Sequence, residues 1–316
     1  MTSDTNAGRS RERPVFSREL SVVIGSVDAE RAIRTCVASV IESCRAIDTE
    51  IILVDASNDG TAEIAGADFP DVQVIEMPRD TLVPRLWSEG VRRARGEKIA
   101  LLTANCEVNA RWARELAAAI DAGATGAGGP VALAQDASRV DEAIYFSRYS
   151  AFLPSAFSGV KRVRDIAGDN AMYHAASLLR HMASFSDGFW EVEFHEIIRR
   201  EGKYLVMCAA APITFGHANT LDMISRQRFL HGRHFGAWRV AHRRANAARV
   251  IISGPFVPLV LFQRIARTAW KSRADRKRFI SAAPLILRLA ARWSLGEIFG
   301  AFDALNSSRE KNANRS

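Results

Sequence analysis

The chain has 316 residues, 48% of them hydrophobic and 25% charged, which is enough for one large α/β domain with an appended region. Its net charge of +8 favours a polyanionic partner such as a phosphorylated ligand, a nucleic acid or an anionic membrane surface. The four cysteines show no CxxC spacing, which argues against a zinc site or a disulfide framework and fits a reducing cytoplasmic compartment. Residues 1–18 are polar and predict a disordered lead-in with no cleaved signal peptide.

Short β-branched runs alternate with helical patterns over the first 120 residues. We predict strands at 20–25, from 51, at 72–76 and at 99–103. Helices are predicted at 30–46, 61–65 and 82–95, the last ended by Gly96. Such an alternation predicts a mostly parallel sheet flanked by helices and joined by right-handed crossovers.

The segment 51–61, IILVDASNDGT, carries the first candidate site residue. Its apolar run reads as a buried parallel strand, so Asp55 is expected at the carboxyl edge of the sheet, where such sheets hold ligands. The Asp55 carboxylate could accept a hydrogen bond from an imide or a ribose hydroxyl. The alternative is an Asx-turn or a helix cap, with Asp59 starting the next helix.

The middle of the chain gives weaker signals. The glycine-rich segment 123–130 predicts a turn or loop and has no P-loop pattern. The aromatic-rich segment 140–157 is either core or the lining of an acceptor groove. We predict a turn leading into a helix at 165–179, a helix at 189–202 that opens with two glutamates, and a strand at 203–207.

Five segments together resemble the family 2 glycosyltransferases, which are inverting enzymes with a GT-A fold. They are LSVVIGSV, IILVDASNDGT, RARGEKIALLTAN, GDNAMYHAASL and FWEVEFHEIIRREGKYL, in the family's order. The resemblance runs from residue 19 to the C-terminus. It implies a GT-A domain at 19–220, followed by a basic and apolar helical extension at 221–316.

The resemblance also implies roles for single residues. The donor would be a nucleotide-diphosphate sugar, with a UDP-sugar favoured, and Asp55 would contact its base. Glu191 takes the position of the catalytic base, with Glu193 two residues on, although a carboxylate there could simply pair with the helix dipole. The remaining donor-binding candidates are Gly25, Ser26, Val27, Asp28, Ser57 and Asn105. The acceptor-binding candidates are Gly168, Asp169, Asn170, Arg228 and His231.

The metal-binding D-x-D motif of the family is altered here. Thr103-Ala104-Asn105 stands in its place, and a hard divalent cation prefers carboxylate oxygen. Glu107 is a possible substitute ligand for Mn²⁺ or Mg²⁺, so metal use stays open. Polar and cationic side chains could neutralise the departing diphosphate instead, although each alone could also be a surface or capping residue. These candidates are His217, Arg226, Gln227, Arg228, His231 and Arg233.

Two functions remain open at this point. The first is transfer of a sugar, with inversion, to a lipid-linked or polysaccharide acceptor. The second is a non-catalytic relative that binds nucleotide-sugar or a partner enzyme, as the altered D-x-D would allow. We expect no nucleic-acid partner, because the arginines lie beside apolar runs and not on an aromatic-faced sheet.

The C-terminal extension predicts peripheral attachment to the inner face of a membrane. Its first apolar stretch, 250–262, is too short to span a bilayer, and Arg288, Arg292 and Glu297 interrupt the second, 279–301. The second stretch is therefore expected to lie in an anionic interface, with the basic run 271–278 beside it. The alternative is a helical pair packed on the domain or across a homodimer.

Overall fold

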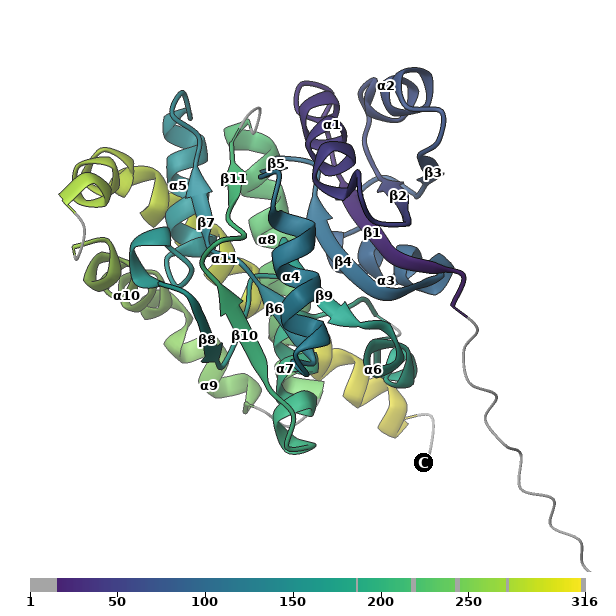
Figure 1. Ribbon diagram of the computed structural model, residues 1–316. Coiled ribbons are helices and arrows are strands. Elements are labelled where there is room, and N and C mark those ends of the chain that lie inside the picture. The colour runs from purple at the N-terminus through teal and green to yellow at the C-terminus, as the bar shows by residue number, and fades with distance from the viewer. Residues whose placement is uncertain (1–15, 186, 217–219, 242–244, 271–272, 314–316) are drawn as a thin grey trace, which may run out of the picture.

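The computed structural model describes residues 16–185, 187–216, 220–241, 245–270 and 273–313 (Figure 1). The predicted lead-in up to residue 15, His217 and Lys271 lie outside the described residues. The described part contains a large mixed sheet with helices on both faces and a group of C-terminal helices beside it.

The central sheet has eight strands in the order β3-β2-β1-β4-β9-β6-β10-β8. The first four are parallel, β9 is antiparallel to both of its neighbours, and β8 is antiparallel to β10. In sequence order their bounds are β1 Arg18–Ser26, β2 Thr49–Asp55, β3 Gln73–Glu76, β4 Gly96–Thr103, β6 Gly126–Gly128, β8 Val160–Val163, β9 Asn170–His174 and β10 Leu205–Cys208. A second sheet, ordered β5-β11-β7, joins Cys106–Val108, Ile213–Phe215 and Val131–Leu133.

Two hydrophobic cores lie on the two faces of the sheet. Alternate strand residues enter each core: Val22 packs with α1 and α4, and Val23 packs with α3 and α7. The helices of the α/β part are α1 Ile33–Cys44, α2 Thr61–Asp68, α3 Val83–Arg93, α4 Trp112–Asp121, α5 Arg139–Tyr149, α6 Ala175–Arg180 and α7 Glu191–Arg200. The 3₁₀ turns are Pro154–Ala156, Met182–Phe185 and Gly254–Phe256.

The alternating strands and helices of the first 103 residues confirm the predicted parallel α/β unit. Gly96 is a correction, because α3 ends at Arg93 and Gly96 opens β4 instead of ending a helix. A Cβ atom at Gly96 would meet the backbone of Leu20 and Ser21 in β1, so this position requires the missing side chain.

Two central strands were not predicted. The glycine-rich segment expected as a loop contains β6, and the expected turn at 165–179 contains β9 before α6 begins. Gly126 is covered by Tyr173 of β9 and Leu205 of β10, so neighbouring strands supply the side chains that β6 lacks. The aromatic segment belongs mainly to the core, where Tyr145, Phe146 and Tyr149 are buried.

The C-terminal helices are α8 Leu221–Ala241, α9 Ala247–Ser253, α10 Val257–Ala269 and α11 Arg273–Ala313. α8 and α11 cross closely, because glycines on each helix meet backbone atoms of the other. Part of the apolar face of α11 faces protein: Ile286 and Leu289 are fully buried in the core, whereas Leu295, Phe299 and Phe302 are 40–49% exposed. The packed alternative therefore describes part of α11, and contact of its exposed apolar residues with a membrane stays a prediction.

The first apolar stretch is longer than predicted. Residues 247–269 join α9, a 3₁₀ turn and α10 into 23 helical residues. Within the described residues this is the one helix long and apolar enough to cross a membrane by length and composition. The expectation that it is too short to span is thus corrected.

Candidate functional site

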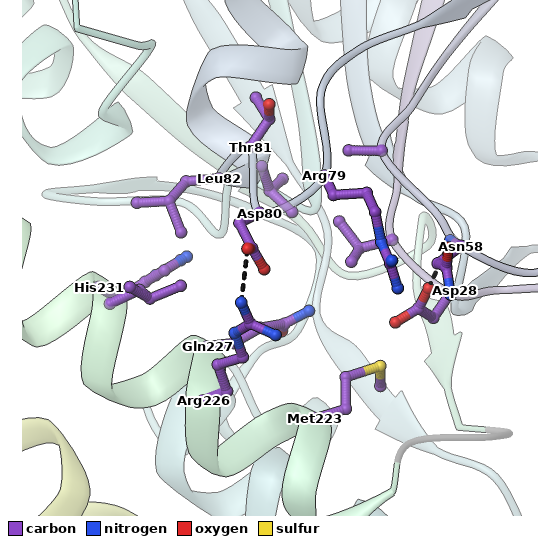
Figure 2. Close-up of a pocket in the computed structure, with 14 residues that line it drawn as sticks. Asp28, Asn58, Arg79, Asp80, Thr81, Leu82, Met223, Arg226, Gln227 and His231 are labelled. Carbon is purple, nitrogen blue, oxygen red and sulfur yellow. Dashed lines mark hydrogen bonds and ion pairs between the residues drawn. The ribbon is translucent and has the colours of Figure 1, made fainter.

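A cavity of about 120 Å³ lies where the carboxyl ends of β1, β2 and β3 face α8 (Figure 2). One wall consists of the loops that follow these three strands, and the opposite wall is the first half of α8. The helical extension therefore completes a pocket that the α/β part alone leaves open. The lining residues are Val27, Asp28, Ala56, Asn58, Arg79, Asp80, Thr81, Leu82, Val83, Met223, Arg226, Gln227, Leu230 and His231.

Two aspartates of this pocket have an unusual backbone. Asp28 has φ of 49° and Asp80 has φ of 66°, and they are the non-glycine residues with positive φ in the described part. The Asp28 N–H donates to Ser57 Oγ at 2.8 Å, and the Asp28 carboxylate accepts from the Asn58 N–H at 2.9 Å. These bonds hold a left-handed conformation that typically costs about 1–3 kcal/mol, and such strain clusters at binding sites.

Asp55 lies directly behind this loop. It is buried, and its carboxylate accepts from Ser57 Oγ at 2.5 Å and from the Ser57 N–H at 3.2 Å. Burial raises its pKa. The Asx-turn alternative thus describes its present hydrogen bonds, and its contact with a base stays a prediction. Asp59 accepts from the Thr61 N–H at the start of α2.

The sequence analysis named Arg226 among the cationic candidates but missed two other charged residues of the pocket, Arg79 and Asp80. Asp80 and Arg226 form an ion pair of 2.5 Å that crosses from the loop after β3 to α8. Arg79 extends toward Asp28 and Asn58 (Figure 2). The signal was available: Arg79 and Asp80 closely follow a predicted strand, and the carboxyl ends of parallel strands gather at one edge.

Glu191 begins α7 and has an environment that perturbs its acidity. Its side chain packs beside Gly168, where a Cβ atom would lie 3.3 Å from the carboxyl carbon. Burial raises the pKa of Glu191 from 4.5 to about 7, and the charges of Asp169 and Asp165 add to the rise, while Arg148 opposes it. Such a carboxyl group is half ionised near neutral pH, as a general base requires.

Glu193 lies two residues further along α7. Successive helical residues turn by about 100°, so Glu193 points about 200° away from Glu191. The two carboxylates therefore cannot serve the same reacting group, and the geometry favours Glu191 over Glu193.

A buried histidine fixes the orientation of α7. His195 Nε2 lies 2.8 Å from the Tyr173 hydroxyl of β9, and its Nδ1 lies 3.3 Å from Asp165. Burial lowers the pKa of His195, while the contact with Asp165 opposes that shift. These contacts tie the helix that carries Glu191 to the centre of the sheet.

The side chains of the predicted acceptor residues that follow Gly168 already form hydrogen bonds with other groups of the protein. Asp169 accepts two hydrogen bonds from Arg148, at 2.7 and 3.0 Å, and one from the Tyr149 hydroxyl at 2.7 Å. The fully buried Asn170 amide bonds Trp112 and two backbone carbonyls. Arg148 was missed by the sequence analysis, although an arginine within an aromatic core segment is itself a signal.

Two arginines from different helices approach each other beside the pocket. Arg228 of α8 stacks on Trp293 at 4.5 Å, and its Nε is buried without a hydrogen-bond partner. Burial and the charge of Arg148 lower the pKa of Arg228 to about 10. Burial and both arginines lower the pKa of His231 to about 3, so this histidine is neutral. The region holds positive charge that an anion would stabilise.

Trp87 links the predicted nucleotide floor to the predicted base. Its Nε1 donates to the Leu102 carbonyl at 2.9 Å, and its ring fills the space beside both Gly25 and Gly168. The two predicted half-sites are therefore separated by one buried aromatic ring.

The other candidates lie apart from the pocket lining. Ser26 is buried at the end of β1, and the exposed Arg233 pairs with Asp303 at 2.6 Å on the α8–α11 face. Thr103 is buried at the end of β4, with its hydroxyl 3.5 Å from Cys106 Sγ. Asn105 lies two residues after Thr103. Glu107 lies in β5, opposite Thr214 of β11 in the strand register.

These donors do not fit a divalent cation site of the D-x-D type. Within the described ranges, no group of three or more His, Cys, Asp or Glu side chains could hold a metal ion. A hydroxyl facing a thiol and a single amide do not replace two carboxylates.

The mixed sheet, with its polar pocket at the strand ends, defines a GT-A type fold of the nucleotide-diphospho-sugar transferases. The family model described as "Glycosyl transferase family 2" matches residues 21–182, just over half of the chain. The chain belongs to this family. The match ends before Glu191 and α8, so it does not reach the predicted base or the second wall of the pocket.

Among solved structures, the chain is similar to that of GalNAc-T7 with UDP, GalNAc and Mn²⁺. The two share 16% identity with a TM-score of 0.47, and the match covers 72% of this chain and 50% of that one. The match thus spans half the length of that chain. A search of curated proteins gives no match.

Proposed function

We propose that the chain transfers a sugar from a nucleotide-diphosphate sugar to a hydroxyl of a lipid-linked or polysaccharide acceptor, with inversion. Membership of glycosyl transferase family 2 supports glycosyl transfer in general. The observation that carries the proposal is Glu191, a carboxyl group with a pKa near 7 at the start of a fixed helix.

In this reaction the acceptor oxygen attacks the anomeric carbon of the donor. Its proton passes to the Glu191 carboxylate as the new C–O bond forms. The bond between the anomeric carbon and the diphosphate oxygen breaks, and its electron pair leaves with the nucleoside diphosphate. One displacement of this kind inverts the anomeric configuration, and base catalysis typically contributes about a hundred- to ten-thousand-fold.

The donor would occupy the cavity between the strand ends and α8. Asp28, Asn58 and Arg79 would surround the nucleoside, with a UDP-sugar favoured, and Asp55 would support the loop from behind. We propose that Arg228, with Arg148 behind it, stabilises the diphosphate as charge develops, in place of a metal ion. A buried guanidinium with an unpaired N–H suits this role.

Asp169 and Asn170 would act on the acceptor side indirectly. Since their side chains already bond Arg148, Tyr149 and Trp112, we propose that they position the backbone next to Gly168. Gly168 would leave room for the acceptor hydroxyl to reach Glu191. We also propose the domain limits 19–220 and 221–316. In this division α8 belongs to the second region, and its side chains line the donor pocket.

A second candidate is a non-catalytic relative that binds nucleotide-sugar. The specific observation in its favour is Thr103-Ala104-Asn105 in place of a carboxylate pair. Such a protein would bind donor and release no nucleoside diphosphate under any condition.

The test is Glu191→Gln in the full chain, with Glu193→Gln as the matched control on the same helix. UDP binding is measured by calorimetry, and nucleoside diphosphate release is measured across a panel of UDP-sugars. We expect unchanged UDP affinity and a fall in release of about a hundredfold or more for Glu191→Gln only. Equal release by wild type and Glu191→Gln would remove Glu191 from the role of base. UDP binding with no release from any donor would favour the non-catalytic candidate.

A further inference from the structure

One helical face carries large apolar side chains that no described part of the protein covers. Ile252, Phe256, Leu259 and Val260 are 61–73% exposed, and we call these four residues the apolar patch. They recur at intervals of one to four residues along the helical stretch 247–269, so they share one side of it. A soluble protein rarely leaves such residues together without a partner.

The opposite side of the same stretch is fixed in the protein. Ile265 and Ala269 are buried in the core, and the Ser294 hydroxyl of α11 donates to the Gly254 carbonyl at 2.5 Å. Gly254 also packs against Ile298. Because a spanning helix would have to break these contacts, this stretch is suited to lie on a membrane and not to cross it.

The charges around the patch are basic. Exposed Arg249 precedes it, and exposed Arg264 and Arg267 follow it. Between residues 223 and 274 the sequence has eleven arginines and lysines and no aspartate or glutamate. Of the helices packed against α10, α5 carries Glu142, which faces Arg278 at 3.9 Å, and α11 carries Asp275, which also has a partner.

An apolar groove adjoins the patch. It lies between the end of α8, the start of α9 and the end of α11, and Val240, Ile251 and Leu305 line it. Figure 1 shows α9 and α10 on the side of the molecule opposite α2 and β3.

We propose that the apolar patch docks the protein on an anionic lipid bilayer as a peripheral, non-spanning contact. The four side chains enter the boundary between headgroups and acyl chains, while Arg249, Arg264 and Arg267 contact anionic headgroups. A bilayer offers this combination of an apolar layer under a negative plane. The proposal goes beyond sugar transfer and does not depend on it.

The experiment measures co-sedimentation of the full chain with vesicles of phosphatidylcholine alone or mixed with phosphatidylglycerol. We expect binding to the mixed vesicles at low salt, weak binding to phosphatidylcholine, and release by high salt. Phe256→Glu combined with Leu259→Glu should lower the partition coefficient about tenfold or more. Val160→Glu is the matched control, because Val160 on β8 is as exposed as Leu259, each at 63%, and it should change nothing.

A second variant tests the charges without touching the apolar side chains. Arg249→Gln combined with Arg264→Gln should lower binding to mixed vesicles about fivefold per arginine and reduce the preference over phosphatidylcholine. UDP affinity, measured on the same samples, should stay at the wild-type value in both variants. A wild-type chain that does not bind UDP would overturn the proposed function, but it would not affect the conclusion from the vesicle experiment.

Four outcomes would overturn the docking proposal. The first is a full chain that does not bind anionic vesicles at low salt. The second is a patch variant that binds as well as Val160→Glu. The third is binding that resists both high salt and alkaline carbonate, which would indicate a spanning helix. The fourth is a homodimer in solution that the patch variant dissociates, since the patch would then face a second copy.

Discussion

At the scale of single residues, the acidity of Glu191 gives the sharpest prediction. Its folded pKa of about 7 lies above its ordinary value of 4.5, so the folded protein holds this proton more tightly than the unfolded chain does. Glu191 therefore lowers stability as pH rises from about 4.5 to about 7. We expect Glu191→Gln to raise the melting temperature more at pH 8 than at pH 5, as scanning calorimetry would measure.

The same ionisation controls the rate. Transfer should rise with pH up to about 7 and then level off, because only the carboxylate accepts a proton. Glu193→Gln should preserve this profile. A wild-type rate that is flat from pH 5 to 8, together with equal stabilisation of Glu191→Gln at both values, would contradict the raised pKa.

The family resemblance selected Glu191, Asp28 and His231 as candidates, and their roles stay predictions. The resemblance could not show that Arg148 lies near Glu191, because that approach depends on how α5 packs under the sheet. The raised pKa is also a property of the folded surroundings: burial and two other carboxylates cause it. A sequence shows which groups can titrate, and the fold sets the pH at which they titrate.

At the scale of elements, the crossing of α8 and α11 depends on glycine. A Cβ atom at Gly300 would overlap backbone of Arg233 and Ala237, while a Cβ atom at Gly66 in α2 would meet nothing within 4 Å. We expect Gly300→Ala to destabilise the protein by about 1–3 kcal/mol, because the helices must separate. Gly66→Ala should stabilise by about 0.5–1 kcal/mol through helix propensity alone.

Both substitutions replace glycine by alanine, and both positions lie within a helix. Thermal and urea unfolding of the two variants beside wild type therefore isolates the crossing itself. Shifts of the same sign and size would show that α8 and α11 are not held at this distance. Opposite signs are the expected result.

Elements with strong side-chain patterns were predictable, and elements defined by their neighbours were not. β1, β2 and β4 have β-branched, buried runs, which identified them as strands. β6 is Gly-Ala-Gly, and its strand character comes from hydrogen bonding to β9 and β10. The amphipathic pattern of α11 was read correctly, but periodicity cannot show whether protein or lipid covers the apolar face.

At the scale of the whole molecule, the pocket forms only where the α/β part meets the helical extension. Asp80 from one and Arg226 from the other form an ion pair across it. The excess of positive charge is concentrated in that extension, between residues 223 and 274. The donor's diphosphate would therefore be neutralised by side chains of the extension and not by ligands at the end of β4.

This arrangement predicts donor binding that does not require a metal. UDP affinity of the full chain, measured by calorimetry, should agree within about twofold in a chelator and in Mn²⁺ or Mg²⁺, because the donors at Thr103 and Asn105 do not suit these ions. Arg228→Gln should weaken UDP binding about tenfold or more, since a charged hydrogen bond contributes about 1.5–3 kcal/mol. Arg233→Gln is the control on the same helix: Arg233 pairs with Asp303 away from the pocket, so affinity should hold. Binding abolished by the chelator and restored by added Mn²⁺, with Arg228→Gln unchanged, would assign the diphosphate to a metal and direct attention to Glu107.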